Sequence, residues 1–306
     1  MKKILIVGSR GYVGSALYKH LSLRDDLTVH GLDSCLYNPS GQHTIVMDYK
    51  NMSEDLVKRY DVVILLAGHS SVKMCEGDFI NSYNNNVNNF IELVKKLNES
   101  CKFIYASSSS VYGRIDHVAN ENDRDFIPYN NYDITKHIID MCVDRFDIEY
   151  YGLRFGTVNG YSPLLRKDLM INSMYTSSID NGEIKLYIKK IMRPILGMND
   201  LLRGIEKIID TNSDNRGLYN MCSFNKTAED IAMGVSQIVN VPVKEYQVDQ
   251  INNSKLQTVC YDFAIDSTKF EKTFNFEFTD TIETIVSGLM GGKFITSDRS
   301  KEFKYE

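Results

Sequence analysis

The stretch KILIVGSRGYVG, residues 3–14, decides the fold of this chain. Ile4 to Val7 form a continuous apolar run, which is typical of a strand buried on both faces of a parallel sheet. Glycines at 8, 11 and 14 follow at once, and helical spacing of apolar residues begins at Tyr12. Such a turn lets backbone N–H groups approach a pyrophosphate at a helix N-terminus. The stretch therefore predicts a dinucleotide site.

Strand and helix patterns alternate along the first half of the chain. Beside residues 3–7, strands are expected at 28–32, 44–47, 61–66, 102–106 and 149–154, and helices at 12–21, 53–59, 79–97 and 131–145. This βαβ repetition predicts an α/β fold with a doubly wound parallel sheet, Rossmann-like. Later helices are expected near 169–179, 200–209 and 228–239. We expect 1–156 to bind the dinucleotide, with segments near 190–215 returning to it, and 157–306 to form mainly a smaller mixed C-terminal substrate lobe.

Composition and charge exclude several classes of protein. The 306 residues carry a formal net charge of -5, so no global basic surface is available for nucleic acid. No stretch reaches the roughly 18 apolar residues that a membrane-spanning helix needs. Six cysteines are scattered without a CxxC pair, which favours free thiols in a reducing cytoplasm. No metal site and no membrane partner are expected.

Asp33 and Arg10 bear on the choice of dinucleotide. Asp33 follows Gly14 by 19 residues at the end of the second expected strand, where a carboxylate accepts hydrogen bonds from a ribose diol. A carboxylate there repels the 2'-phosphate of NADP and so predicts NAD. Arg10 is the opposite signal, because a cation in the glycine loop could bond that phosphate. NAD is the expected cofactor, and NADP is the alternative.

A tyrosine and a lysine form the expected proton-transfer pair. Tyr132 and Lys136 stand one helical turn apart, which puts the phenol and the ammonium on one face. A tyrosine with a pKa of about 10 is a poor base at neutral pH. An adjacent ammonium and a positive nicotinamide ring both lower that pKa. The serine run 107–110 follows an expected strand, at the edge where open α/β sheets bind ligands.

These motifs together resemble those of the extended short-chain dehydrogenase/reductase family, in the NAD-dependent nucleotide-sugar epimerase/dehydratase branch. The resemblance covers nearly the whole chain. The matching segments are the loop 8–14, Asp33, Asp48, 66–68, Asn86-Val87, the SSxxVYG pattern at 107–113, Tyr132xxxLys136, 153–160, Arg193-Pro194 and 217–220.

The resemblance implies a role for each matched residue. Ser108 is expected to hydrogen-bond a sugar hydroxyl, Tyr132 to act as the base, and Lys136 to bond the nicotinamide ribose. Asp48 and Tyr49 are expected to flank the adenine. The expected cofactor-binding residues, from the loop and the resemblance together, are Gly8, Arg10, Gly11, Tyr12, Val13, Gly14, Asp33, Asp48, Tyr49, Leu66, Ala67, Gly68, Asn86, Ser107, Tyr132, Lys136 and Phe155.

The implied reaction begins with oxidation of a sugar carbon, most often C4. Sugar 4,6-dehydratases of the family carry Asp-Glu where this chain has Ser109 and Ser110, and decarboxylating relatives carry a glutamate at the second position. A serine hydroxyl is too weak an acid or base for either reaction. An epimerase is therefore expected, with an NAD(P)-dependent 4-ketoreductase or dehydrogenase as the alternative. A dinucleotide sensor without turnover is disfavoured, because it needs no proton-transfer pair.

Several substrate-side residues depart from the family pattern. Many epimerases read RYFNVYG where this chain reads RFGTVNG at 154–160, so Thr157 replaces an asparagine that faces the substrate phosphates. Arg193 is retained and suits bidentate phosphate binding. The second phosphate arginine, expected just before Asp262, is missing, and Arg166 and Asn172 are the nearest replacements. The expected residues for a nucleotide-diphosphate sugar are Ser108, Ser109, Thr157, Arg166, Asn172 and Arg193.

The resemblance also implies an assembly. In the family, the helices that correspond to 79–97 and 131–145 pair across a two-fold axis into a four-helix bundle. Asparagines crowd the first of these segments, but Ile80, Val87, Ile91 and Val94 keep an apolar face along it. A homodimer is therefore expected, and it would accompany catalysis.

Overall fold

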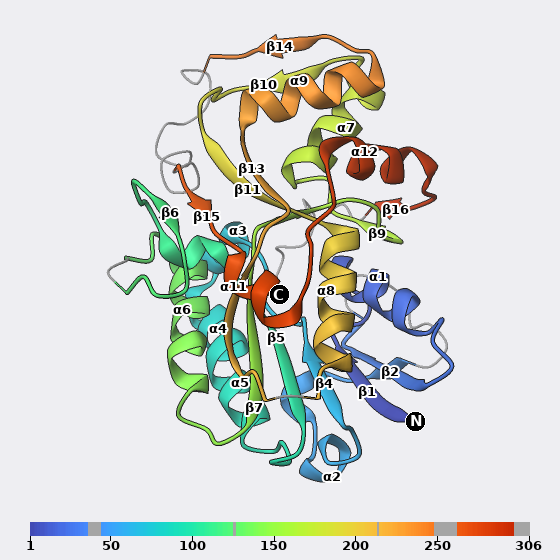
Figure 1. The fold of residues 1–306 in the computed structure, drawn as a ribbon, viewed down its shortest axis with the longest axis vertical. Helices are drawn as coiled ribbons and strands as arrows, with labels where there is room; N and C mark the ends of the chain where they lie inside the picture. Colours follow the sequence, from blue (N-terminus) through green and yellow to red (C-terminus); the bar gives the residue numbers. More distant parts are fainter. Residues whose placement is uncertain (36–43, 125–126, 213, 248–261, 297–306) are drawn as a thin grey trace.

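The computed structural model describes residues 1–35, 44–124, 127–212, 214–247 and 262–296. Its largest sheet has seven strands, all parallel, in the order β12-β7-β5-β4-β1-β2-β3 (Figure 1). These strands are β1 Lys2–Val7, β2 Leu27–Asp33, β3 Thr44–Val46, β4 Val62–Leu65, β5 Lys102–Ser108, β7 Glu149–Phe155 and β12 Gly217–Met221. The chain starts in the middle of the sheet and winds outward in both directions, so the predicted doubly wound fold is confirmed.

Helices cover both faces of this sheet. Ile4 and Ile6 pack into one hydrophobic core with α1 and α8, whereas Leu5 and Val7 pack into a second core with α5 and α6. The helices of the two faces are α1 Tyr12–Leu21 and α8 Met198–Asp210 on the first, and α4 Phe79–Tyr83, α5 Asn89–Val94 and α6 Asn131–Val143 on the second. Because successive strand residues face opposite sides, an inner strand covered on both faces must be apolar at every position.

The segment 79–97 differs from the single helix that its apolar spacing predicts. It consists of α4, a π-helical turn at Asn84–Asn88, labelled η2, and α5. The hydroxyl of Tyr49 donates to the carbonyl oxygen of Asn85 inside this turn. A side chain from outside the helix thus takes an acceptor of the backbone ladder, which is a known cause of such irregularity. π-Helical turns recur at functional sites, and this one carries Asn86.

The smaller mixed lobe lies at the end of the sheet where the strands finish (Figure 1). Its three-stranded sheet has the order β13-β11-β8, with β11 antiparallel to β13 and parallel to β8. The lobe contains β8 Thr157–Asn159, β11 Met192–Gly197, β13 Phe224–Thr227, α7 Met170–Asn181, α9 Ala228–Val239, α12 Ile282–Gly291 and the pair of β10 Ile184–Leu186 with β14 Val243–Glu245. Between β11 and β13 the chain returns to the large sheet as α8 and β12.

Short elements complete the described chain. They are η1 Tyr49–Asn51, α2 Glu54–Val57, α3 Val72–Gly77, η3 Ser109–Tyr112, α11 Thr268–Phe274, the pair β6 Val118–Ala119 with β15 Ala264–Ile265, and the pair β9 Leu164–Leu165 with β16 Ile295–Thr296. Across the described ranges, none of the helices has the length and apolar character needed to cross a bilayer.

Candidate active site

The glycine loop after β1 is closely packed. Gly8 has a φ of +90°, in the region that favours glycine. A Cβ atom at Gly14 would lie 2.0 Å from the carbonyl oxygen of Gly8. Gly11 precedes α1 directly, so the N–H groups of Tyr12 and Val13 belong to the first turn, where no partner exists within the helix. The loop therefore fits a pyrophosphate at this helix N-terminus.

The side chain of Asp33 links the glycine loop to the end of β2 by hydrogen bonds. One carboxylate oxygen accepts the backbone N–H of Arg10 at 2.9 Å, and the other accepts that of Cys35 at 2.8 Å. Each oxygen keeps a second lone pair, which can accept a bond from a ribose hydroxyl. The residues present thus fit NAD, and the carboxylate charge opposes a 2'-phosphate at the same place.

The loop after β4 forms the next part of the predicted cofactor site. The N–H groups of Leu66 and Ala67 both donate to the carbonyl oxygen of Val7, at 2.8 and 3.0 Å, which sets them beside the glycine loop. The side-chain oxygen of Asn86 accepts the N–H of His69 at 2.8 Å. Its amide group donates to the carbonyl oxygen of His69 at 3.0 Å and to the hydroxyl of Thr135 at 3.1 Å.

The side chain of Asn86 therefore links the loop after β4 to helix α6 by hydrogen bonds. A Cβ atom at Gly68 would lie 2.8 Å from the Asn86 side-chain oxygen, and the φ of Gly68 is +146°. Only glycine fits easily there. The bond to Thr135 matters because Thr135 lies between Tyr132 and Lys136 on α6. The predicted cofactor loop and the predicted catalytic helix are thus joined directly.

The two residues predicted at the adenine end lie in η1. Asp48 accepts the backbone N–H of Lys50 at 3.1 Å and pairs with its ammonium at 3.2 Å. The ring of Tyr49 is buried in the core that includes α5, and its hydroxyl is bound to Asn85. The structure gives Tyr49 a packing role, and its contact with adenine stays a prediction.

Ser108, Tyr132 and Lys136 come together at the end of β5. The hydroxyl of Ser108 is near enough to the phenol of Tyr132 to lower the pKa of that phenol. The ammonium of Lys136 lies 5.9 Å from the centre of the Tyr132 ring and donates to the carbonyl oxygen of Ala106 at 2.7 Å. The strand end, the phenol and the ammonium therefore have fixed positions relative to one another.

Ser110 is a residue of this site that was not among the predicted binding residues. Its hydroxyl lies 2.7 Å from that of Ser108, and its backbone N–H donates to the Ser108 hydroxyl at 3.2 Å. Ser109, which was predicted to bind substrate, is buried in η3, and its contact with a substrate stays a prediction. The serine run contained the signal, but a 3₁₀ turn after the strand decides which hydroxyl faces Ser108.

Burial shifts the pKa values of both members of the proton-transfer pair. Burial raises the pKa of Tyr132 to about 12, although the nearby hydroxyl of Ser108 and the charge of Arg166 lower it. Burial lowers the pKa of Lys136 to about 8, and Asp140 opposes that change. The phenol alone is therefore a weak base at neutral pH, and further positive charge is needed to ionise it.

Arg166 and Asn172 differ in how free they are to meet a substrate. The guanidinium of Arg166 pairs with Asp168, donates to the carbonyl oxygen of Ser70 at 3.2 Å, and is near enough to Tyr132 to affect its phenol. Asn172 is fully buried. Its amide donates to the Tyr12 hydroxyl and to the Arg166 carbonyl oxygen, both at 3.0 Å. Asn172 would contact a substrate only by giving up one of these bonds.

The other predicted residues lie on both lobes. Phe155 ends β7 and is paired in register with Ser108. Thr157 begins β8 opposite Ile195, two residues beyond Arg193 on β11, so Thr157 and Arg193 share the small sheet. The guanidinium of Arg193 lies 5.6 Å from the Phe263 ring centre.

The hydroxyl of Ser107, a predicted cofactor-binding residue, donates to Asp140 at 2.9 Å. The stretch just before Asp262, where a second phosphate arginine was sought, lies outside the described residues.

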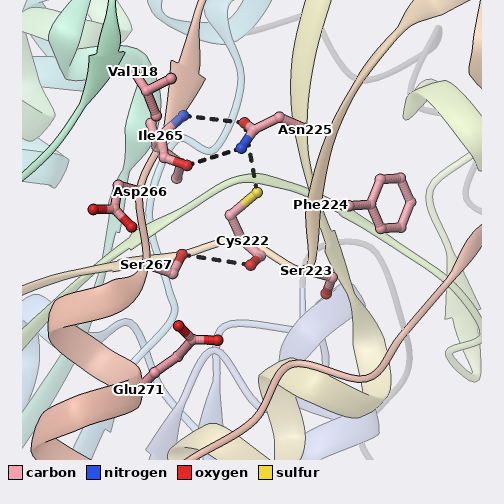
Figure 2. A pocket seen from close by; sticks show the side chains of 9 residues that line it. All are labelled: Val118, Cys222, Ser223, Phe224, Asn225, Ile265, Asp266, Ser267 and Glu271. Carbon is pink, nitrogen blue, oxygen red and sulfur yellow. Dashed lines mark hydrogen bonds between the residues drawn. The ribbon is translucent and has the colours of Figure 1, made fainter.

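A polar cavity of about 330 Å³ lies beside the end of β12 (Figure 2). The residues that line it are Val118, Cys222, Ser223, Phe224, Asn225, Ile265, Asp266, Ser267 and Glu271. Two of them are carboxylates and none is a cation, so this cavity does not suit the diphosphate of a nucleotide sugar. The predicted cofactor and catalytic residues lie instead at the ends of β1, β4 and β5.

A model of the NAD dependent epimerase/dehydratase family matches residues 4–222. The chain belongs to this family. Membership confirms the predicted resemblance, the class of enzyme and NAD as the cofactor.

Individual members of the epimerase/dehydratase family resemble the chain at moderate identity. UDP-glucuronate 4-epimerase 1 of Arabidopsis thaliana is 28% identical over 244 residues, which are 70% of this chain and 56% of the plant protein. The chain thus spans about half the length of this relative.

Solved structures of family members share the fold. UDP-glucuronic acid 4-epimerase from Bacillus cereus, in complex with UDP-glucuronic acid and NAD, superposes with a TM-score of 0.79 at 22% identity, covering 94% of this chain and 97% of that chain. Helicobacter pylori ADP-L-glycero-D-manno-heptose-6-epimerase gives a TM-score of 0.79 at 21% identity, covering 94% and 95%.

Proposed function

We propose that the protein is a nucleotide-sugar epimerase that oxidises the sugar at C4 and reduces it again from the opposite face. The observation that carries this proposal is the placement of the Tyr132 phenol, which lies near Ser108 and one helical turn from Lys136, whose ammonium is 5.9 Å from the centre of the Tyr132 ring. The relatives named as UDP-glucuronate 4-epimerases support C4 and a UDP-sugar.

The residues of the site suit this chemistry. Bound NAD supplies the hydride acceptor and the positive charge of its oxidised ring. Tyr132 accepts the proton of the sugar hydroxyl as the carbon is oxidised, while Ser108 holds that oxygen. Lys136 stabilises the phenolate through its charge. When the ketone is reduced from its other face, Tyr132 returns the proton.

The hydroxyl of Ser110 supports epimerisation over elimination of water. Elimination needs an acid and a base beside the reacting carbon. At this place the structure has Ser110, bonded to Ser108 at 2.7 Å, and not a carboxylate. The ketone formed at C4 would therefore be reduced again and not dehydrated.

We assign the binding residues in two groups. The glycine loop, Asp33 and the loop 66–69 would hold NAD, since their backbone approaches most closely at the helix N-terminus. Arg166, Thr157 and Arg193 would face the nucleotide sugar, since Arg166 is near Tyr132 and the other two share the small sheet.

Incubation of the protein with UDP-glucuronic acid, UDP-glucose and their C4 epimers, followed by proton NMR, tests this function. We expect interconversion of one C4 pair with a trace of NAD and no added reductant, because the hydride returns to the same sugar. A requirement for stoichiometric NAD or NADP, reduced as the sugar is oxidised, would identify a dehydrogenase or a ketoreductase running in reverse. Loss of the sugar 4-proton with a new 6-methyl signal and no epimer would identify a dehydratase.

We further propose a homodimer through α4, α5 and α6. Ile80 on α4 is 68% exposed and Met141 on α6 is 62% exposed, which is unusual for large apolar side chains on neighbouring helices. Ile80→Glu and Met141→Glu should each yield monomers in light scattering. Met233→Glu, at an exposed methionine on α9, is the control. A wild-type protein that is monomeric at high concentration would contradict the proposal.

A cytoplasmic location is also proposed, and it rests on cysteine chemistry. Cys35, Cys75, Cys101, Cys142 and Cys222 all carry free thiols. Free thiols persist in reducing compartments. Thiol titration of protein taken directly from its source cells should count them all as reduced, and a disulfide-linked form would contradict this location.

A further inference from the structure

Asp140 is a buried carboxylate on the catalytic helix that the proposed reaction does not use. One of its oxygens accepts the hydroxyl of Tyr105 at 2.9 Å. The other accepts the hydroxyl of Ser107 at 2.9 Å and the Nε–H of Arg154 at 2.8 Å. Asp140 is 4% exposed and Arg154 is 2% exposed, so this ion pair is nearly cut off from water.

Asp140 and Lys136 hold the same three residues of β5. Asp140 lies one helical turn beyond Lys136 on α6. The carboxylate binds the side chains of Tyr105 and Ser107, which point to one face of the strand, and the ammonium binds the carbonyl oxygen of Ala106 between them. Ser108 is the next residue. Two opposite charges on one helix face thus fix the strand end that carries the catalytic hydroxyl.

The charges around Asp140 give it a second effect. Arg154 also donates to the Tyr112 hydroxyl at 2.8 Å, which donates in turn to Asn220 at 2.9 Å, so the guanidinium is held in place. Asp140 therefore bonds the buried Arg154 and also acts on the buried Lys136. Without that carboxylate the ammonium of Lys136 would lose the negative charge that most opposes the effect of its burial, and it would lose its proton more easily.

We propose that Asp140 is a positioning residue that holds Lys136 in its charged form and in register with Ser108 and Tyr132. This inference rests on the proposed function, since it assumes that Tyr132 transfers the proton. The geometry supports the inference, because the side chains of Asp140 and Lys136 together bond residues 105–107 of β5. The opposing effect of Asp140 on the burial-lowered pKa of Lys136 agrees with it.

Other titratable and charged groups face this pair from every neighbouring element. They are Tyr132 and His137 on α6, Cys75 on α3, Tyr105 on β5, Tyr150 and Arg154 on β7, Tyr112 on η3, Lys269 on α11 and Glu121. Asp140 bonds Arg154 and acts on Lys136, so a change at Asp140 acts mainly through these two cations.

The pH dependence of kcat in the variant Asp140→Asn tests the inference. The amide keeps the shape of the carboxylate and removes its charge, so the alkaline limb of kcat should move to lower pH by about one unit. The NAD dissociation constant should change by less than about threefold, because Asp140 touches no expected cofactor atom. The control is Asp144→Asn. Asp144 is an exposed carboxylate one turn further along α6, and its replacement should leave the alkaline limb of kcat in place.

A second variant distinguishes an effect of charge from a general loosening of the structure around Asp140. Arg154→Gln removes the cation and leaves the carboxylate, so its alkaline limb should move to higher pH. If Asp140→Asn fails to fold, the shift in Arg154→Gln carries the test alone. The inference is overturned if the alkaline limb of kcat stays in place in folded Asp140→Asn. It is also overturned if that limb moves to lower pH in Arg154→Gln. Failure of the proposed function is distinct, because the wild-type protein itself would then convert none of the sugars.

Discussion

The hydroxyl of Tyr12, at the start of α1, donates to the carbonyl oxygen of Gly160 at 2.8 Å, across 148 residues of chain. It also accepts the side-chain amide of Asn172 at 3.0 Å. Tyr12 lies within the glycine loop 8–14, whereas Gly160 and Asn172 belong to the smaller lobe. A single phenol thus joins the helix at the cofactor loop to the other lobe.

Removal of this phenol should weaken the junction between the lobes. Tyr12→Phe leaves the Gly160 carbonyl and the Asn172 amide buried with one partner fewer, so the free energy of unfolding should fall by about 1–3 kcal/mol. Urea denaturation measures this. Tyr18→Phe, on the more exposed side of the same helix, should change stability by less than about 0.5 kcal/mol. Equal losses in the two variants would argue against a junction role.

Asp33 should set the preference for NAD over NADP. Asp33→Asn keeps the acceptor for the Arg10 N–H and removes the negative charge, so the ratio of the NADP and NAD dissociation constants should fall about tenfold. Fluorescence titration with each dinucleotide gives the ratio. Asp25→Asn, an exposed aspartate just before β2, is the control. An unchanged ratio in Asp33→Asn would show that another group rejects the 2'-phosphate.

The pH profile of turnover should show the charge state of Lys136. The reaction needs Tyr132 ionised and Lys136 protonated, and burial lowers the pKa of Lys136 to about 8. As the pH rises through that value the ammonium loses its charge, the phenolate loses stabilisation, and kcat should decline. Lys136→Arg should be slower but should lack this decline, since a guanidinium does not titrate there. The same decline in Lys136→Arg would assign it to another group.

Local patterns were sufficient to predict the fold and to predict that Tyr132 and Lys136 lie together on one helix face. Residues 4–7 of β1 and all of β4 are apolar, and the Tyr132 and Lys136 spacing places both side chains on one face of α6. Each of these patterns is formed by residues that are close together in the sequence, so the sequence shows it directly. The same holds for the glycine loop, whose close contacts only glycine permits.

Features made by distant residues were not visible in the sequence. The π-helical turn in 79–97 depends on a bond from Tyr49 to Asn85, 36 residues away, while the apolar spacing of the segment suits a regular helix. The partner of the Ser107 hydroxyl is Asp140, 33 residues further along the chain. No local pattern predicts such pairs, because packing of α6 on β5 creates them.

The most direct test of the central claim compares Tyr132→Phe with the wild-type protein in the same sugar incubation. The ring stays in place and only the proton-transferring oxygen is lost, so kcat should fall by about 10²–10⁴. The NAD dissociation constant should change by less than about tenfold, since the glycine loop and Asp33 are untouched. Turnover within a factor of two of wild type would contradict the claim that the Tyr132 phenol is the base.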